Sequence, residues 1–284
     1  MSRILVPALA LPSLFAAAPA LADQPRPWGM WMQPAASPIM HQIVALNTII
    51  TGIILVIVIL VFGLLGYVIF RFRASRNPVP AKWTHNTPLE VAWTLGPVLV
   101  LVFIAFPSFH LLYSMDRVKD ADLTLRVTGH QWYWSYAYPD QKVSFDANLV
   151  QGSDLKPGQP RLLTTDNPVV LPVGAVVRVQ TTADDVIHSW SVPALGVKLD
   201  AIPGRTNETW VKIDRAGTYY GQCSQLCGIN HGFMPIEVQA VTKDQFAAWV
   251  QQNQTKQKSS SAGNTRLAEA GSSESSSNRG NNRP

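Results

Sequence analysis

Two long runs of apolar residues dominate the first half of the chain. Residues 28–70 contain no Asp, Glu, Lys or Arg, and their apolar core at 43–70 exceeds the ~20 residues that a membrane-spanning helix needs. A second run without these charged residues lies between Glu90 and Asp116, and its two prolines are better tolerated in spanning helices than in soluble ones. A soluble helix this long and uncharged would be rare. The pattern therefore predicts two transmembrane helices.

Charged residues between the two runs orient this hairpin. Four basic residues follow the first run: Arg71, Arg73, Arg76 and Lys82. Lys and Arg are enriched on the cytoplasmic side of spanning helices. We therefore expect a hairpin at 43–116 with a cytoplasmic loop near 71–89, and both of its ends outside the cytoplasm.

The N-terminus is typical of a signal peptide at residues 1–22. Arg3 precedes an apolar stretch at 4–18, and Ala20-Leu21-Ala22 fits the small-x-small cleavage rule. Residues 23–42 would then form an extracytoplasmic segment. Export agrees with the orientation of the hairpin, since everything after Asp116 is expected to be periplasmic.

After the hairpin the pattern changes to short β-type runs. They are alternating or β-branched, punctuated by Gly, Pro, Asn and Asp, and lie at Leu123–Val127, Ala175–Thr181, Thr209–Ile213 and Ile236–Ala240. This spacing predicts an all-β Greek-key sandwich or barrel at 117–253. A capping box, Thr242-x-x-Gln245, then opens a short helix with an apolar face.

Composition adds little beyond this outline. The chain is 47% hydrophobic and only 14% charged, which is low for a soluble protein. Residues 254–284 are mostly Ser, Asn, Gly and Gln and are expected to be disordered, because they cannot bury a core. No C-x-x-C-H motif for a c-type haem is present, and nothing indicates nucleic-acid binding.

Potential metal ligands are concentrated between Cys223 and Met234, in C-S-Q-L-C-G-I-N-H-G-F-M. This stretch holds both cysteines of the chain, a histidine and a methionine, which are soft or borderline ligands that suit copper. Two thiolates can each bridge two metal ions, so the loop has the ligands for a dinuclear copper centre. A second histidine must come from upstream, and His188 is the best candidate.

Two other interpretations compete with copper. A Cys223–Cys227 disulfide is common chemistry for an exported domain, but it would close a very short loop and leave His231 and Met234 unexplained. Structural zinc prefers closed sets of four Cys or His and rarely uses methionine. The ligand chemistry therefore favours copper.

At these residues the chain resembles subunit II of haem–copper cytochrome c oxidases of the bacterial and mitochondrial kind. Matching stretches run in family order from about residue 39 to residue 250: His85–Trp93, Val127–Tyr136, Asp185–Pro193, Asp200–Arg205 and Tyr219–Ile236. The resemblance implies a cupredoxin-like domain with a dicopper centre. Its ligands would be His188, Cys223, Cys227, His231, Met234 and the carbonyl of Gln225.

The resemblance also assigns roles to Glu90 and Trp132. In similar subunits the glutamate of H-x-x-P-L-E lies at the mouth of a proton-uptake path, whereas the residue pattern alone favours a helix-start acid. The tryptophan matching Trp132 admits electrons from cytochrome c, although a core role is the ordinary reading of this aromatic run. Strand alternation would place Trp132 and Trp134 on one face, with Tyr133 on the other.

Two departures from the family pattern affect other expectations. Similar proteins carry glutamate where this chain has Gln225, and that carboxylate binds magnesium at the border with subunit I, so a magnesium site is doubtful here. An acidic residue is usual where this chain has Ala137, which weakens the expected acidic docking surface for cytochrome c. Asp146, Asp184 and Asp185 remain candidates for that surface.

These observations predict an electron-entry subunit of an oxidase. It would accept electrons from cytochrome c, pass them to subunit I for oxygen reduction and proton pumping, and assemble with subunits I and III in the bacterial inner membrane. Quinol oxidase subunit II lacks the copper ligands that are intact here. A membrane-tethered copper carrier would need neither Trp132 nor Glu90, and another dicopper electron-transfer protein, nitrous-oxide reductase, needs a further large domain.

Overall fold

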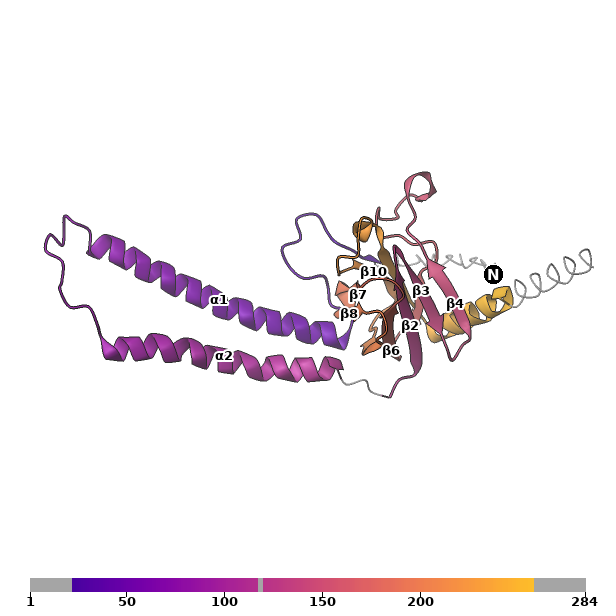
Figure 1. Cartoon of the computed structure of the whole chain (residues 1–284), viewed down its shortest axis with the longest axis horizontal. Helices are drawn as coiled ribbons and strands as arrows, with labels where there is room; N and C mark the ends of the chain where they lie inside the picture. Colours follow the sequence, from indigo (N-terminus) through magenta and orange to yellow (C-terminus); the bar gives the residue numbers. More distant parts are fainter. Residues whose placement is uncertain (1–21, 117–119, 258–284) are drawn as a thin grey trace, which may run out of the picture.

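A computed structural model describes residues 22–116 and 120–257 of the chain. The predicted signal peptide, apart from Ala22, and residues 258–284 of the predicted tail lie outside the described residues. Figure 1 shows a long helical hairpin extending from a β domain at one end.

The hairpin consists of α1 (Pro38–Arg71) and α2 (Thr87–Asp116), joined by residues 72–86. Both helices are long and apolar enough to cross a membrane, and their apolar side chains are largely exposed. α1 begins before the predicted boundary at residue 43 because Ser37 caps it. The Ser37 hydroxyl accepts a hydrogen bond from the Met40 amide (3.0 Å) and donates one to the Leu195 carbonyl (2.7 Å), which fastens the helix to the β domain.

The β domain is a sandwich of two sheets, as predicted, and each predicted strand is present with shifted ends. One sheet has the order β5-β11-β10-β7-β8, with β1 paired to β10: β1 (Ala22–Asp23), β5 (Val169–Pro172), β7 (His188–Val192), β8 (Val197–Ala201), β10 (Gly217–Cys223) and β11 (Pro235–Val241). The other has the order β4-β3-β2-β6-β9: β2 (Leu123–His130), β3 (Tyr133–Tyr138), β4 (Val143–Ala147), β6 (Val176–Ala183) and β9 (Asn207–Lys212).

Large side chains from both sheets fill the space between them. Trp134 on β3 and Trp190 on β7 are fully buried, and the Trp190 indole donates a hydrogen bond to the Tyr136 hydroxyl (3.2 Å). Burial of such rings contributes much of the hydrophobic stabilisation of a domain. The same core cluster includes Cys223 at the end of β10 and Met234 just before β11, so it packs against both ends of the loop between these strands.

The structure corrects the predicted placement of Trp132. β2 ends at His130 and β3 begins at Tyr133, so Trp132 lies in the turn between the strands. Strand alternation therefore does not relate Trp132 to Trp134. Trp134 is fully buried, whereas Trp132 packs only partly against the core.

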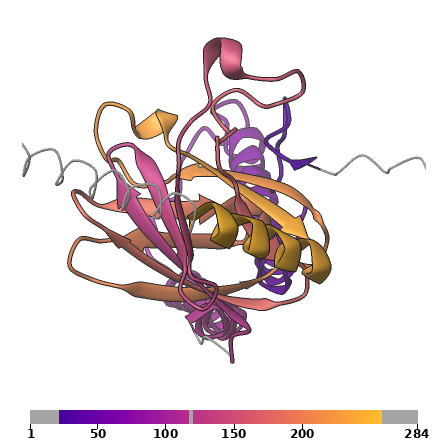
Figure 2. The ribbon, with the colours of Figure 1, turned by 90° about the vertical axis from the view of Figure 1, so that its right-hand side faces the viewer.

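A helix at residues 243–257 closes the described part of the chain at the end of the sandwich remote from the hairpin, as Figure 2 shows in yellow. The predicted capping box is confirmed: the Thr242 amide donates to Gln245 Oε1 (3.0 Å), and the Gln245 amide donates to Thr242 Oγ1 (3.3 Å). Trp249 packs against the core. The helix continues past the predicted domain boundary at residue 253, where the Gln254 side chain donates to the Gln141 carbonyl.

Candidate metal centre

Neighbouring strands of one sheet bring the candidate ligands together. His188 is the first residue of β7 and Cys223 is the last residue of β10, and these two strands pair antiparallel. The loop from β10 to β11 supplies Cys227, His231 and Met234. Its ends are joined by a hydrogen bond from the Cys223 amide to the Met234 carbonyl (3.0 Å), so the loop closes on itself.

Two free, buried thiols form the middle of the site. The sulfurs of Cys223 and Cys227 lie 3.8 Å apart, and both cysteines are unpaired. His188 Nδ1 lies 3.9 Å from the Cys223 sulfur, and the ligand atoms of these three residues all lie within 4.8 Å of one another. Three buried soft or borderline donors this close can hold a metal ion.

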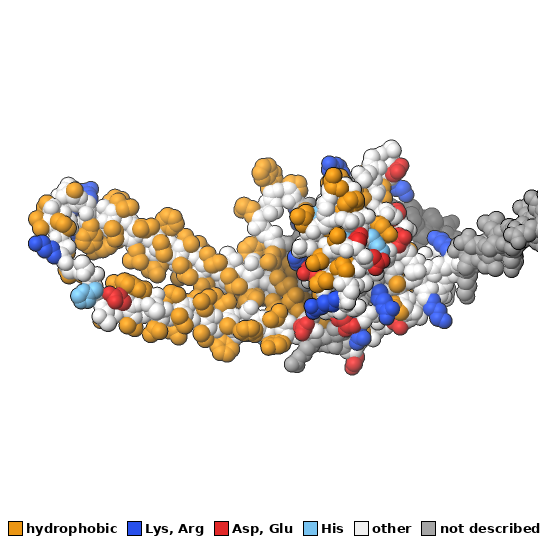
Figure 3. All heavy atoms as spheres, in the orientation of Figure 1, with side chains coloured by type: hydrophobic (Ala, Val, Ile, Leu, Met, Phe, Trp, Pro, Cys, Tyr) orange, Lys and Arg blue, Asp and Glu red, His pale blue; other side chains and the backbone are white. Residues whose placement is uncertain are grey.

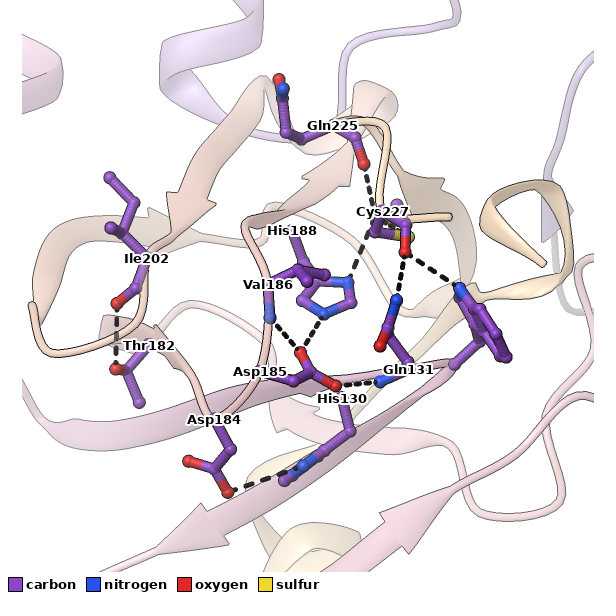
Figure 4. Close-up of polar contacts among 12 residues, drawn as sticks. His130, Gln131, Thr182, Asp184, Asp185, Val186, His188, Ile202, Gln225 and Cys227 are labelled. Carbon is purple, nitrogen blue, oxygen red and sulfur yellow. Dashed lines mark hydrogen bonds and ion pairs between the residues drawn. The ribbon is translucent and has the colours of Figure 1, made fainter. Parts of the chain in front are cut away.

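Three further predicted ligands surround the sulfurs. His231 Nδ1 lies 3.5 Å from the Cys227 sulfur, and the Gln225 carbonyl lies 3.3 Å from the Cys223 sulfur. The side chain of Gln225 points away from the sulfurs (Figure 4). Met234 is fully buried in the same cluster as both cysteines. A thioether beside thiols fits copper better than zinc.

A carboxylate holds the ring of His188 in place (Figure 4). Asp185 Oδ1 lies 2.8 Å from His188 Nε2, which leaves Nδ1 facing the thiols. The other oxygen of Asp185 accepts a hydrogen bond from the Gln131 amide (2.6 Å). Such outer contacts fix the orientation of a ligand imidazole. A Cβ atom built on Gly129 would lie 2.7 Å from His188 Cδ2, so only glycine leaves room for this ring.

The electrostatics of the site favour ionisation of Cys223 and oppose ionisation of Cys227. Burial opposes ionisation of Cys223, but the hydrogen bond from His188 and nearby backbone groups outweigh it and lower the pKa of this thiol. Burial and the adjacent Cys223 raise the pKa of Cys227. Burial lowers the pKa of His188, yet contacts with Cys223 and Asp185 outweigh it and raise that pKa. A bound cation would supply the charge that lets the second thiol ionise.

Two side chains from the β2–β3 turn converge on the Cys227 carbonyl. The indole of Trp132 donates a hydrogen bond of 3.1 Å, and Gln131 Nε2 donates one of 2.8 Å. The contact links Trp132 directly to the ligand loop. Sequence reasoning missed Gln131 and treated Asp185 only as a docking charge. The sequence signal for both was their position in the motifs: Gln131 is next to Trp132, and Asp185 is three residues before His188.

Glu90 lies far from this centre, at the start of α2, at the end of the hairpin remote from the β domain (Figure 1). Its carboxylate accepts a hydrogen bond from the Asn86 amide (3.2 Å), while Asn86 Oδ1 accepts one from the Leu89 amide (3.2 Å). Asn86 and Glu90 thus cap the helix reciprocally. The structure therefore shows that Glu90 helps to cap the N-terminus of α2.

The fold and the site together define a membrane-anchored, cupredoxin-like protein with a loop built for a soft metal. Residues 123–241 match the family described as cytochrome c oxidase subunit II, periplasmic domain, and residues 25–111 match its transmembrane domain. The chain belongs to the cytochrome c oxidase subunit II family. It is therefore a subunit of an oxidoreductase and a membrane protein with a periplasmic domain, and the copper-carrier alternative is not favoured.

Two relatives agree with this assignment, and part of the chain is similar to a solved structure. The probable cytochrome c oxidase subunit 2 of Rickettsia bellii is 50% identical over 230 residues, covering 81% of this chain and 86% of that protein. Cytochrome c oxidase subunit 2 of Cereibacter sphaeroides is 44% identical over 248 residues, covering 81% of this chain and 82% of that protein. A crystal structure of the periplasmic domain of subunit II of cytochrome oxidase from Bradyrhizobium japonicum is 54% identical, with a TM-score of 0.47, covering 49% of this chain and 99% of that one.

Proposed function

We propose that this chain is the electron-entry subunit of its oxidase and that its β10–β11 loop holds a dinuclear copper centre. The observation that carries the proposal is the convergence of His188 on two free, buried thiols. Two thiolates with two imidazoles, a thioether and a carbonyl supply enough soft donors for two copper ions. The ligands would be His188, Cys223, Gln225 through its carbonyl, Cys227, His231 and Met234.

The protein's own contribution is a rigid ligand set. A bound copper pair would supply one-electron chemistry, so that the site could accept electrons from reduced cytochrome c for delivery to subunit I. Asp185 holds His188, and the Cys223–Met234 backbone contact closes the loop. Ligands that are already fixed by hydrogen bonds move little when the charge of the site changes, which favours fast electron transfer.

Electron entry would occur at Trp132. Its indole contacts the carbonyl of Cys227, so a donor docked on this side chain would be one hydrogen bond from a ligand. Among the candidate docking charges, Asp184 is 67% exposed and lies 3.6 Å from His130, and Asp146 is also exposed. Asp185 is committed to His188, so it would contribute less to docking than the other two.

The remaining assignments concern the assembly. The partners would be subunit I, which carries haem and copper, and subunit III, in a bacterial inner membrane crossed by α1 and α2. Glu90 would stand at the mouth of a proton-uptake path into subunit I. Because Gln225 replaces a carboxylate with an amide, magnesium binding at the border with subunit I would be weak or absent.

Copper stoichiometry tests the central proposal. The full chain, loaded with copper and stripped of loosely bound metal, is expected to hold two ions and to give the EPR spectrum of a delocalised mixed-valence pair. Cys223→Ser and Cys227→Ser should each abolish that spectrum, because each removes one of the two thiols that would hold the copper ions. Ser224→Ala, a change at an exposed position of the same loop, should leave it intact. One copper ion per unmutated chain would refute the proposal.

A further inference from the structure

Residues 24–36 form a loop held firmly at both ends. At its start, Asp23 pairs with Arg215, and Arg215 Nη1 also donates a hydrogen bond to the Ala35 carbonyl (2.7 Å). At its end, the Ala36 amide donates to the Ala194 carbonyl (2.9 Å), just before the cap of α1 at Ser37. Both ends of the loop are therefore fixed to the β domain, next to the start of α1.

The middle of this loop exposes large apolar side chains. Trp28 is 97% exposed and Met30 96%, with Trp31 at 54% and Met32 at 39%. These four residues, in the stretch W-G-M-W-M, pack into no core cluster of the described residues. Clustered apolar exposure of this kind marks an interaction site in a soluble domain. The only charged residue at 24–37 is Arg26.

The loop lies on the membrane side of the β domain. In Figure 1 it bends away from the sandwich and extends alongside the first turns of α1, in the direction of the membrane-spanning part. Figure 3 shows apolar side chains on this projection, above the apolar surface of the hairpin. Tyr113, near the end of α2 at Asp116, is 59% exposed at the same end of the hairpin. An exposed aromatic side chain is thus also present at the end of the hairpin next to the β domain.

We propose that the W-G-M-W-M loop inserts into the headgroup region of the outer leaflet and anchors the periplasmic domain on the lipid surface. Trp rings prefer this region because they combine a large apolar area with a polar N–H group. Met30 and Met32 add apolar area, and the guanidinium of Arg26, two residues before Trp28, would pair with a lipid phosphate. The loop lies alongside the apolar surface of the spanning helices (Figure 1 and Figure 3), so one bilayer would cover both.

Photolabelling of the assembled oxidase tests this placement. The complex is placed in nanodiscs that contain a phosphatidylcholine with a diazirine near the glycerol end of one acyl chain, irradiated, digested and mapped by mass spectrometry. Peptides covering residues 24–36 are expected to carry the label, whereas peptides from the remote helix at 243–257 should carry none. Trp28→Ser combined with Trp31→Ser should reduce labelling of the loop several-fold. Gln24→Ser, an exposed polar change in the same loop, should not.

Aqueous oxidation separates the outcomes that would overturn the proposal. An unlabelled loop whose Met30 is oxidised rapidly by hydrogen peroxide would be a loop in water. An unlabelled loop whose Met30 resists peroxide would be covered by another protein subunit. An unchanged copper spectrum in each variant confirms that the β domain is folded, so loss of label reports the loop alone.

Discussion

At the scale of single residues, the carbonyl of Cys227 is the point where the surface meets the metal loop. Trp132 and Gln131 both donate hydrogen bonds to it, from a turn that belongs to the other sheet. A donor electron that enters the indole would reach a ligand residue through one hydrogen bond. The second donor means that the loop keeps a supporting contact when the indole is removed.

This arrangement predicts a separation between electron transfer and copper binding. Trp132→Ala should slow oxidation of cytochrome c by roughly tenfold or more, equivalent to about 1.4 kcal/mol in activation free energy. The mixed-valence spectrum should survive, because Gln131 still donates to the Cys227 carbonyl. Trp132→Phe keeps a ring but loses the N–H donor, so its rate of cytochrome c oxidation should lie between those of the unmutated protein and Trp132→Ala. Stopped-flow kinetics with reduced cytochrome c measures both variants, and unchanged rates would return Trp132 to a packing role.

The candidate metal ligands could be predicted from the sequence, but the residues that hydrogen-bond to them could not. Thiol, imidazole and thioether side chains are scarce and chemically distinctive, so Cys223, His231 and Met234 stand out in the sequence. Asp185 and Gln131 are common residues whose contacts depend on where a turn and a strand end. Trp132 was misplaced for the same reason, since alternation holds only inside a strand.

At the scale of elements, the start of α2 combines a structural and a proposed functional role in Glu90. Its carboxylate completes a reciprocal cap with Asn86. A cap of this kind contributes about 1 kcal/mol to helix stability. Loss of activity in Glu90→Ala would therefore be ambiguous, because fraying of the helix and loss of a proton carrier would both lower turnover.

Two substitutions resolve this ambiguity. Glu90→Gln keeps an oxygen that can accept from the Asn86 amide but cannot carry a proton, whereas Glu90→Ala removes both functions. If Glu90 relays protons, turnover of the assembled oxidase should fall in both variants to a similar extent, with the copper spectrum unchanged. Asn86→Ala, which breaks the cap but keeps the carboxylate, should retain turnover. Normal oxygen consumption in Glu90→Gln would identify Glu90 as a capping residue only.

The hairpin and the sandwich were the most predictable elements. Long uncharged runs have few alternatives to membrane helices, and the family match at residues 25–111 agrees with them. The loop at 24–36 was not predictable as a feature, because its position depends on distant contacts with Arg215 and Ala194. Contacts between residues so far apart in the chain leave no local pattern.

At the scale of the whole molecule, Gln225 is the residue of the metal loop that we propose to lie at the border with subunit I. Its backbone carbonyl faces the Cys223 sulfur at 3.3 Å, while its side chain is exposed and points away from the site (Figure 4). Any residue supplies a carbonyl, so the proposed copper role does not depend on the side chain. At the proposed border with subunit I the exposed side chain would face any bound ion, and there the difference between a neutral amide and a carboxylate would matter.

Magnesium binding at that border should therefore be weak in this protein. Mg²⁺ is a hard cation that favours charged oxygen ligands, and the neutral amide of Gln225 is a poorer ligand than a carboxylate. Mn²⁺ can replace Mg²⁺ and reports its own occupancy by EPR. Oxidase assembled in the presence of manganese is expected to show low occupancy with Gln225 and higher occupancy with Gln225→Glu, beside an unchanged copper spectrum. Ser224→Glu, which adds the same charge one residue away, should not raise occupancy. Equal manganese in the Gln225 and Gln225→Glu enzymes would show that the amide suffices or that subunit I holds the ion alone.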